Sequence, residues 1–478
     1  HTRGAVTDFA AETLLHRPAL ERVAALHRRE VSSVELTRQS FQRIEALNPQ
    51  YQAFVTLIER SALDQAAHHD RQSRRTSPDR MPFFSGIPTG VKDLNLLRGA
   101  FARMGAKAYQ WLWSPIDDVT VASLRRAGFV FVGKTATSEF AILPVVEPET
   151  HGPTRNPWNP AHTAGGSSGG AASAVAAGMI PIAQGSDGGG SIRIPASVCG
   201  LVGHKASAGL LPNPHAGVDK LAMSSNGALT RTVDDTAAML DVLTGRRPGA
   251  EGSFLRAIER PPGQLTIGYC TEPPIGRTAP EVAAVLARTA GILSDLGHIV
   301  VPVAATTGSI QEFLPVYQRM AAAAPLLSEA GLQPITLWLR AAGRKITDAD
   351  AKRARDGLVA RIEAWCDAGG APGRPRFDAW LMPTVPVLAP RVGEFNDYPP
   401  AEGFDRAAVM GAFTALWNLT GRPACTVPAG EADGLPIGAQ LIGHIGADAA
   451  LLALARQLDG ALRPVRRAGF APCRPLVG

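Results

Sequence analysis

Two serines in glycine-rich segments are the residues of this sequence best suited to chemistry. Ser167 lies in Gly-Gly-Ser-Ser-Gly-Gly (165–170), and Ser191 follows three glycines in Asp-Gly-Gly-Gly-Ser-Ile-Arg-Ile-Pro (187–195). Glycine allows positive φ and a close approach of a ligand to the backbone. Successive free N–H groups in such turns form an anion-binding concavity. A serine hydroxyl placed there could attack a carbonyl carbon while the amides stabilise the oxyanion.

A flexible Gly/Ser linker is the alternative interpretation of this stretch. The segment Ala171–Ala177 between the two serines is rich in alanine, a strong helix former, and Gly178 follows it. Apolar residues also surround Arg193 in the second motif. We therefore predict a loop, a helix and a loop within a packed domain.

A serine nucleophile needs a base, and Lys92 is the candidate. It follows Gly-Ile-Pro-Thr-Gly-Val (86–91), and three leucines occur within residues 94–97. A lysine can take a proton near neutral pH only if burial lowers its pKa, and these apolar neighbours favour burial. Asp93 would oppose that shift, so we expect its carboxylate to point away from Lys92. The alternative is a solvated lysine at a strand end, the usual place of this residue type.

Three motifs together resemble the amidase signature family. They are Gly-Ile-Pro-Thr-Gly-Val-Lys-Asp, Gly-Gly-Ser-Ser-Gly-Gly and Asp-Gly-Gly-Gly-Ser-Ile-Arg-Ile-Pro, and the two serines are 24 positions apart, as in that family. The resemblance runs from about Phe83 to Thr232 and resumes at Pro423–Gly443. It implies an α/β fold in which helices cover both faces of a large mixed β-sheet. It also implies a serine hydrolase that cleaves C–N bonds of amides.

The resemblance assigns roles to the three candidates. Ser191 would be the nucleophile, and Ser167, on a cis peptide bond, would pass its proton to Lys92. Ser138-Glu139-Phe140 fits a segment that lies near the active site in the family. No cofactor and no metal are implied.

Neighbouring residues are expected to support this site. The backbone N–H groups of Gly188, Gly189, Gly190 and Ser191 would bind the oxyanion. Asp187 and Arg193 are expected to pair across the turn and brace it. We assign Ser168 to capping the helix that follows, which is the alternative role for either serine of that motif.

Substrate preference depends on loops outside the motifs. The sequence departs from common family patterns at Gly188, at Ala206-Ser207 and at Thr137, which leaves the shape of the acyl pocket open. Candidate pocket residues, mostly apolar or aromatic, are Thr137, Phe140, Ile142, Leu210, Leu211, Trp338, Phe395, Tyr398 and Trp417. Such a lining suits aryl and alkyl amides, anilides, carbamates (urethanes) and esters. The closest family members in character would be broad aryl or alkyl amidases, nylon-oligomer hydrolases and urethanases.

Two other functions are considered. The amidase-like subunit of a tRNA-dependent amidotransferase shares the triad, but those subunits usually carry Gln after Ser-Ile-Arg, where this chain has Ile194. Residues 128–135 match the phosphate-loop pattern G-x-x-x-x-G-K-[ST], yet the four intervening residues alternate aromatic and β-branched types. That alternation indicates a strand where a nucleotide site requires a loop.

Composition limits the remaining possibilities. The 478 residues, 45% of them hydrophobic, can form one large domain or two. The net charge of +6 is scattered, so we expect no nucleic acid partner. Five widely spaced cysteines show no disulfide framework, and no apolar run is long enough to span a bilayer. We expect a cytoplasmic enzyme, without a membrane partner, that binds a small-molecule amide or carbamate and forms a homodimer.

The predicted elements begin with an N-terminal helical wrap over residues 1–80. Ser32–Glu35 matches a capping box for a helix that ends at Asn48-Pro49. A second helix is expected over Ile58–His69, followed by a surface connection. The catalytic domain would cover residues 81–478, with a substrate-pocket insert or lid at 311–403.

Several strands are predicted within the catalytic domain. A buried strand is expected at Phe129–Val132, and two more flank an amphipathic helix at Glu281–Leu296, which predicts a parallel crossover. The other predicted strands are Leu265–Cys270, Ile299–Val303, Trp380–Met382 and Gly438–Ile442.

Overall fold

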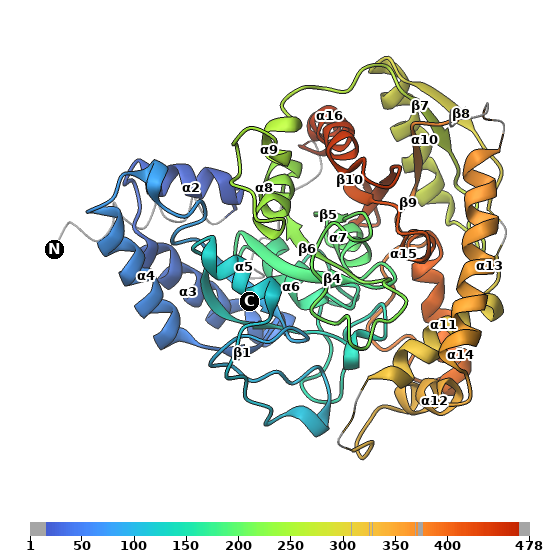
Figure 1. The fold of residues 1–478 in the computed structure, drawn as a ribbon, viewed down its shortest axis with the longest axis horizontal. Helices are drawn as coiled ribbons and strands as arrows, with labels where there is room; N and C mark the ends of the chain where they lie inside the picture. The colour runs from blue at the N-terminus through green and yellow to red at the C-terminus, as the bar shows by residue number, and fades with distance from the viewer. Residues whose placement is uncertain are drawn as a thin grey trace.

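A mixed sheet of eleven strands runs through the molecule (Figure 1). The computed structural model describes residues 16–306, 308–324, 326, 328–368, 370 and 376–467, with residues 465–467 described by their backbone alone. The strand order is β1-β3-β2-β4-β6-β5-β10-β11-β9-β7-β8. The strands are β1 (Phe54–Leu57), β2 (Pro88–Lys92), β3 (Val130–Thr135), β4 (Ile182–Asp187), β5 (Val202–Lys205), β6 (Ser225–Thr230), β7 (Thr266–Tyr269), β8 (Ile299–Pro302), β9 (Ala379–Pro383), β10 (Ala424–Ala432) and β11 (Leu435–Ile442).

Helices cover both faces of this sheet, as expected. Adjacent residues of a strand point to opposite faces, and in β3 Val130 packs in the core that contains α6 and α7, whereas Phe131 packs in the core that contains α5 and α8. The longer helices are α2 (Ala19–His27), α3 (Ser33–Tyr51), α4 (Glu59–Ser73), α5 (Val119–Arg126), α6 (Gly169–Ala176), α7 (Arg193–Val198), α8 (Val233–Leu243), α10 (Pro280–Asp295), α11 (Ile310–Ala323), α12 (Pro334–Gly343), α13 (Asp348–Asp367), α14 (Pro400–Ala408), α15 (Ala415–Leu419) and α16 (Asp448–Arg467).

The parallel crossover at the end of the sheet is confirmed. Strands β7 and β8 pair in parallel, and α10 connects them. The strands predicted around residues 129, 380 and 438 correspond to β3, β9 and β11.

The N-terminal segment differs from the prediction in two respects. It is not entirely helical, because β1 pairs antiparallel with β3 at the edge of the sheet. The capping box of α3 is present, but the helix continues through Pro49 to Tyr51. Pro49 has no N–H to donate within the helix, and only two helical residues follow it. The Asn48 side chain then bonds both backbone groups of Phe54, which turns the chain from the helix into β1.

The phosphate-loop pattern belongs to a strand. Gly133, Lys134 and Thr135 are the last residues of β3. The Lys134 Nζ is buried and donates to Asp93 Oδ1 at 3.2 Å and to the Asn95 carbonyl at 2.7 Å. A buried lysine held by a carboxylate cannot reach a nucleotide phosphate, so the strand interpretation is correct. The same contact shows Asp93 paired with Lys134, not with Lys92, as expected.

The segment 311–403 forms much of the right-hand side of Figure 1, where α11 packs against both α12 and α13. Four cysteines are buried and form no disulfide within the part of the chain that the structure describes, and Cys473 lies outside that part; the four are Cys199, Cys270, Cys366 and Cys425. None of the described helices is long and apolar enough to cross a membrane.

Candidate active site

The carboxyl ends of two parallel strands bring the candidate base to the site. Strand β2 ends at Lys92, and its parallel neighbour β4 ends at Ser186 and Asp187. The backbone N–H of Lys92 donates to Gln184 Oε1 at 3.0 Å, which fixes the end of β2 against β4. Polar groups at the ends of adjacent parallel strands lie at one edge of a sheet, a frequent place for ligand sites in α/β proteins.

Lys92 is completely buried, and its hydrogen-bond partners among the described residues are hydroxyl and carbonyl oxygens. Its Nζ lies 2.7 Å from Ser167 Oγ, 3.0 Å from Ser186 Oγ and 3.4 Å from the Ser186 carbonyl. Burial lowers the pKa of Lys92 to about 7, and the negative charge of Asp187 opposes this shift only in part. A large fraction of the amine is therefore neutral near pH 7 and able to accept a proton.

The Ser167 hydroxyl is held against Lys92 by the residue that follows it. The peptide bond between Gly166 and Ser167 is cis. Ser168 Oγ donates to the Ser186 carbonyl at 3.1 Å and accepts from the Ser186 N–H at 3.3 Å, while its backbone N–H donates to the Ser191 carbonyl at 3.2 Å. Ser168 thus ties the Ser167 segment to both β4 and the Ser191 loop.

This arrangement corrects the expected role of Ser168. The residue stands at the N-cap position of α6, but its side chain makes no capping hydrogen bond. The hydroxyl is directed instead to the end of β4, where it satisfies a backbone donor and a backbone acceptor of one residue. Its function is to join two segments of the site.

The turn after β4 presents three backbone donors. The N–H groups of Gly188, Gly189 and Ser191 have no hydrogen-bond partner in the described part of the chain. The expectation that Gly190 is a fourth donor is wrong, because its N–H donates to Asp187 Oδ1 at 2.8 Å. Gly190 has φ +126°, and a Cβ there would lie 2.2 Å from Thr414 Oγ1, so the position requires glycine.

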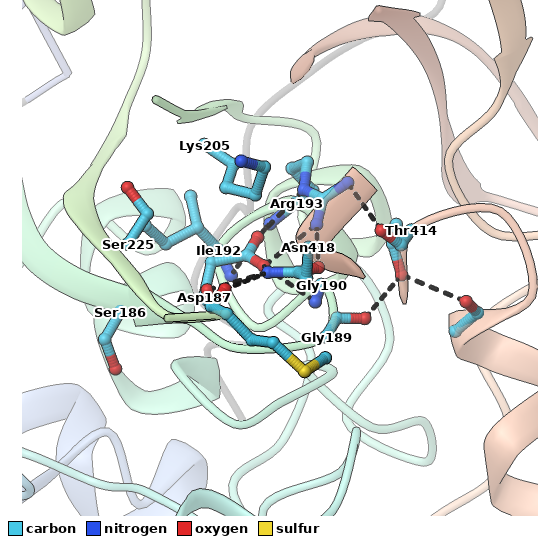
Figure 2. Close-up of polar contacts among 12 residues, drawn as sticks. Ser186, Asp187, Gly189, Gly190, Ile192, Arg193, Lys205, Ser225, Thr414 and Asn418 are labelled. Atoms are coloured by element: carbon cyan, nitrogen blue, oxygen red, sulfur yellow. Dashed lines mark hydrogen bonds and ion pairs between the residues drawn. The ribbon is translucent and has the colours of Figure 1, made fainter. Parts of the chain in front are cut away.

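A buried ion pair shapes this turn, as Figure 2 shows. Asp187 and Arg193 are both fully buried, and Arg193 Nε and Nη2 donate to the two carboxylate oxygens at 2.9 Å each. The same carboxylate accepts from the backbone N–H groups of Gly190 and Ile192. Burial alone would raise the pKa of Asp187, but the Arg193 guanidinium holds it well below its usual range.

Three residues distant in the sequence complete the network around Arg193. Its Nη1 donates to Gln440 Oε1 at 2.7 Å and to the Thr414 carbonyl at 3.0 Å, and its Nη2 donates to Asn418 Oδ1 at 2.7 Å. Thr414 Oγ1 in turn donates to the Gly189 carbonyl at 2.7 Å. No local pattern in the sequence pointed to these residues, because they follow the turn by more than 220 positions.

Ser191 lies where two arms of a cavity meet. A wide arm of about 620 Å³ is lined by Ser167 and Ser186 and by His215 and Asp219 of a loop. A narrow arm of about 90 Å³ has an almost wholly apolar lining that includes Ile194, Phe313, Leu358, Phe404, Leu416 and Leu419. Ile142, Gly189, Ser191 and Tyr317 line both arms.

Tyr317, which lines both arms, donates its hydroxyl hydrogen to the Ile142 carbonyl. Tyr317 belongs to α11, so the 311–403 segment supplies one wall of the cavity. The Ser191 hydroxyl makes no hydrogen bond within the described part of the chain. The hydroxyl lies at the cavity wall and is thus free to meet a ligand.

The predicted pocket residues divide into two groups. Phe140 lines the wide arm and Ile142 lines both, as expected. Thr137 is buried away from the cavity, Leu210 and Leu211 pack on the cores around α8 and α10, and Trp417 is fully buried in the core beside β9. Aromatic and aliphatic residues serve the core more often than a pocket, which accounts for the leucines and the tryptophan.

The remaining aromatic candidates also lie outside the cavity. Trp338 packs behind Phe404 with a ring separation of 5.8 Å, one layer from the narrow arm. Phe395 and Tyr398 line a separate surface hollow, where the Arg406 guanidinium lies 4.0 Å from the Tyr398 ring.

Comparison with known proteins shows which family and which structures this chain resembles. The family model described as Amidase matches residues 35–452. A putative amidase of Synechocystis sp. (strain ATCC 27184 / PCC 6803 / Kazusa) is 31% identical over 469 residues, which covers 96% of this chain and 90% of that protein. The structure of 6-aminohexanoate cyclic dimer hydrolase complexed with substrate superposes with a TM-score of 0.81 at 30% identity, covering 94% of this chain and 97% of that one. One component of the glutamyl-tRNA(Gln) amidotransferase from Thermotoga maritima gives a TM-score of 0.74 at 29% identity, with 93% and 94% covered.

The buried ion pair leads to a prediction about stability. Replacing Arg193 by Met leaves the Asp187 carboxylate buried and unpaired, which we expect to destabilise the fold by about 3–5 kcal/mol. Arg406→Met is the matched control, since Arg406 pairs with Glu402 on the exposed surface of α14. Thermal and urea unfolding should separate the two variants clearly. Equal small losses would show that the ion pair does not brace the turn.

Proposed function

Because this chain belongs to the amidase signature family, we propose that it hydrolyses small amides through an acyl-enzyme on Ser191. Membership of the family supports a hydrolase that acts on amides. The observation that carries the finer proposal is the 2.7 Å contact between the buried Lys92 amine and the Ser167 hydroxyl, beside a cavity lined by Ser191. Ser191, Ser167 and Lys92 would thus serve as nucleophile, proton-transfer group and base, in that order along the path of the proton.

The first half of the reaction forms the acyl-enzyme. Ser191 Oγ attacks the amide carbonyl carbon, its proton passes to Ser167 Oγ, and the Ser167 proton passes to the neutral Lys92 amine. The tetrahedral oxyanion accepts hydrogen bonds from the N–H groups of Gly188, Gly189 and Ser191, each worth about 3–4 kcal/mol in comparable sites. The C–N bond then breaks as Lys92 returns a proton through Ser167 to the leaving nitrogen.

The second half reverses the proton path. Water attacks the acyl carbon while Ser167 and Lys92 take its proton, and the ester bond to Ser191 breaks as that proton returns to Ser191 Oγ. The products are a carboxylic acid and an amine. A carbamate substrate would give a carbamic acid that loses carbon dioxide.

The two arms of the cavity support one orientation of the substrate. Ser167, which protonates the leaving nitrogen, lines the wide arm and not the narrow one. The leaving amine therefore belongs in the wide arm, and the acyl group belongs in the narrow apolar arm. Such a narrow arm suits alkyl or aryl acyl groups more than charged ones.

The substrate class follows from this lining and from the relatives. We propose aryl and alkyl amides and anilides, with carbamates and esters as further substrates. One structural relative is a hydrolase of 6-aminohexanoate cyclic dimer, an amide with alkyl segments. A cytoplasmic location and a homodimer stay predictions from the sequence.

One position disfavours the alternative function in a tRNA-dependent amidotransferase. Ile194, where the amidase-like subunits usually carry Gln, lines the narrow arm together with other apolar side chains. An apolar arm offers no hydrogen bond to the side chain of glutamine, which argues for hydrolysis of apolar amides over glutamine chemistry. Glutaminase activity, or co-purification with tRNA and a second type of chain, would reverse this preference.

The nucleophile can be tested without a known substrate. We expect a fluorophosphonate probe to add once to the chain, at Ser191, and to add nothing to Ser191→Ala. Intact-mass measurement and peptide mapping give both results. An adduct elsewhere, or no adduct on an intact folded chain, contradicts the assignment of Ser191.

The assignment of Lys92 as the base predicts that the rate of labelling depends on pH. Only neutral Lys92 accepts a proton, and its pKa of about 7 means that the rate of fluorophosphonate labelling should rise with pH through about 7 and level off above it. Lys92→Met should lose this dependence. Lys205→Met is the control, because Lys205 is equally buried with a pKa also lowered to about 7 by burial, and its Nζ donates to the Ala206 carbonyl away from the cavity. The midpoint of the labelling rate against pH is compared in the two variants. If it moves in Lys205→Met but persists in Lys92→Met, the titrating group is Lys205, and Lys92 is not the base.

The leaving group separates the acid role of Lys92 from its base role. We expect Lys92→Ala to lower the hydrolysis of hexanoyl 4-nitroanilide by about 10²–10⁴-fold, because the aniline nitrogen must be protonated as it departs. Hexanoyl 4-nitrophenyl ester should lose much less, since nitrophenolate departs without a proton. Steady-state kcat/KM values for the two compounds give the comparison, and equal losses would contradict the role of Lys92 as the acid for the leaving nitrogen.

A further inference from the structure

The wide arm contains a histidine that the reaction described above does not use. His215 lines this arm together with Ser167 and Ser191. Its Nε2 is buried and has no hydrogen-bond partner in the described part of the chain. A buried polar atom without a partner is costly, and in native proteins such an atom commonly has a ligand or another functional reason.

The backbone of the loop around His215 is held by hydrogen bonds within the loop. The backbone N–H of His215 donates to Asn213 Oδ1 at 2.8 Å, and its carbonyl accepts from the N–H groups of Val218 and Asp219. The Asp219 carboxylate connects the beginning of the loop with its end. It accepts hydrogen bonds from Asn213 Nδ2, Met223 N and Ser224 N. The carboxylate of Asp219 is satisfied within the loop, so Asp219 acts as a brace.

Three other polar side chains of the arm have partners, whereas the Ser191 hydroxyl is the proposed nucleophile. Ser167 and Ser186 bond to Lys92, and Tyr317 bonds to the Ile142 carbonyl. Burial and the nearby charge of Lys92 both lower the pKa of His215, while Asp118 and Asp219 oppose this. The ring is therefore neutral near pH 7, with one nitrogen able to donate and the other to accept.

We propose that His215 Nε2 binds a hydrogen-bonding group on the leaving-amine part of the substrate. This inference rests on the proposed function, in which the amine occupies the wide arm. A neutral imidazole can meet either an amide N–H or a carbonyl by choosing its tautomer. The preferred substrates are then amides whose amine part carries a second amide or a similar polar group, as in oligoamides and acylated diamines, with an apolar acyl group in the narrow arm.

The test compares two anilides of the same shape. N-(4-carbamoylphenyl)hexanamide carries a polar group where N-(4-isopropylphenyl)hexanamide carries an apolar one. Their dissociation constants are measured by calorimetry on Ser191→Ala, with and without His215→Phe, which keeps a ring but removes both nitrogens. We expect the preference for the carbamoyl compound to fall about tenfold in the His215→Phe variant, the size of one hydrogen bond. An unchanged preference would overturn the proposal.

Ala216→Leu is the matched control, because Ala216 is exposed on the same loop and does not line the cavity. It should leave the ratio of the two dissociation constants unaltered, and an equal fall in Ala216→Leu would assign the effect to the loop and overturn the role of His215.

A second measurement needs no change at His215. The ¹⁵N resonance of its Nε2 in Ser191→Ala should move with the carbamoyl compound and much less with the isopropyl one, and equal movement would overturn the proposal.

Turnover of both anilides by the chain with Ser191 intact tests the proposed function separately. If both anilides are turned over and the ratio of their dissociation constants is the same with and without His215→Phe, only the proposed role of His215 is contradicted. If the ratio of dissociation constants changes in His215→Phe but neither anilide is turned over, the binding role of His215 is supported and the proposed hydrolysis is contradicted.

Discussion

The buried ion pair between Asp187 and Arg193 is the constraint on which the site depends. Both groups lose their hydration, which a folded protein tolerates only with complete hydrogen bonding. The carboxylate obtains it from the guanidinium and from backbone N–H groups of its own turn, including that of Gly190. The N–H of Gly190 is thereby occupied, whereas the N–H groups of Gly188, Gly189 and Ser191, which line the cavity, have no partner among the described residues.

The same ion pair influences the candidate base. Lys92 and Lys134 lie at the ends of adjacent parallel strands and are equally buried, and Lys134 pairs with the carboxylate of Asp93. The negative charge that acts on Lys92 belongs to Asp187, and Arg193 already neutralises much of it. Burial therefore prevails at Lys92 and lowers its pKa to about 7. Burial also lowers the pKa of Lys134, but there the charge of the Asp93 carboxylate and its hydrogen bond to the amine oppose the shift.

Local patterns in the sequence predicted those parts of the molecule that they determine. The glycine motifs located Lys92, Ser167 and Ser191, and alternation of residue types identified β3. The sequence could not predict β1, whose four residues become a strand only by pairing with β3. Nor could it predict that Trp417 belongs to the core while Tyr317 faces the cavity, since an aromatic residue suits both places and the fold decides between them.

The distance along the chain between the turn and its partners has a consequence for biosynthesis. The carboxamide of Asn418, which holds the Asp187 carbonyl and carboxylate, is separated from Asp187 by 231 positions. At ribosomal rates of about 5–20 residues per second, roughly 10–50 s pass between the synthesis of the two residues. A nascent chain thus carries both serines long before the network around their loop can close. The turn that carries Ser191 therefore obtains its complete set of hydrogen bonds only after most of the chain has been made.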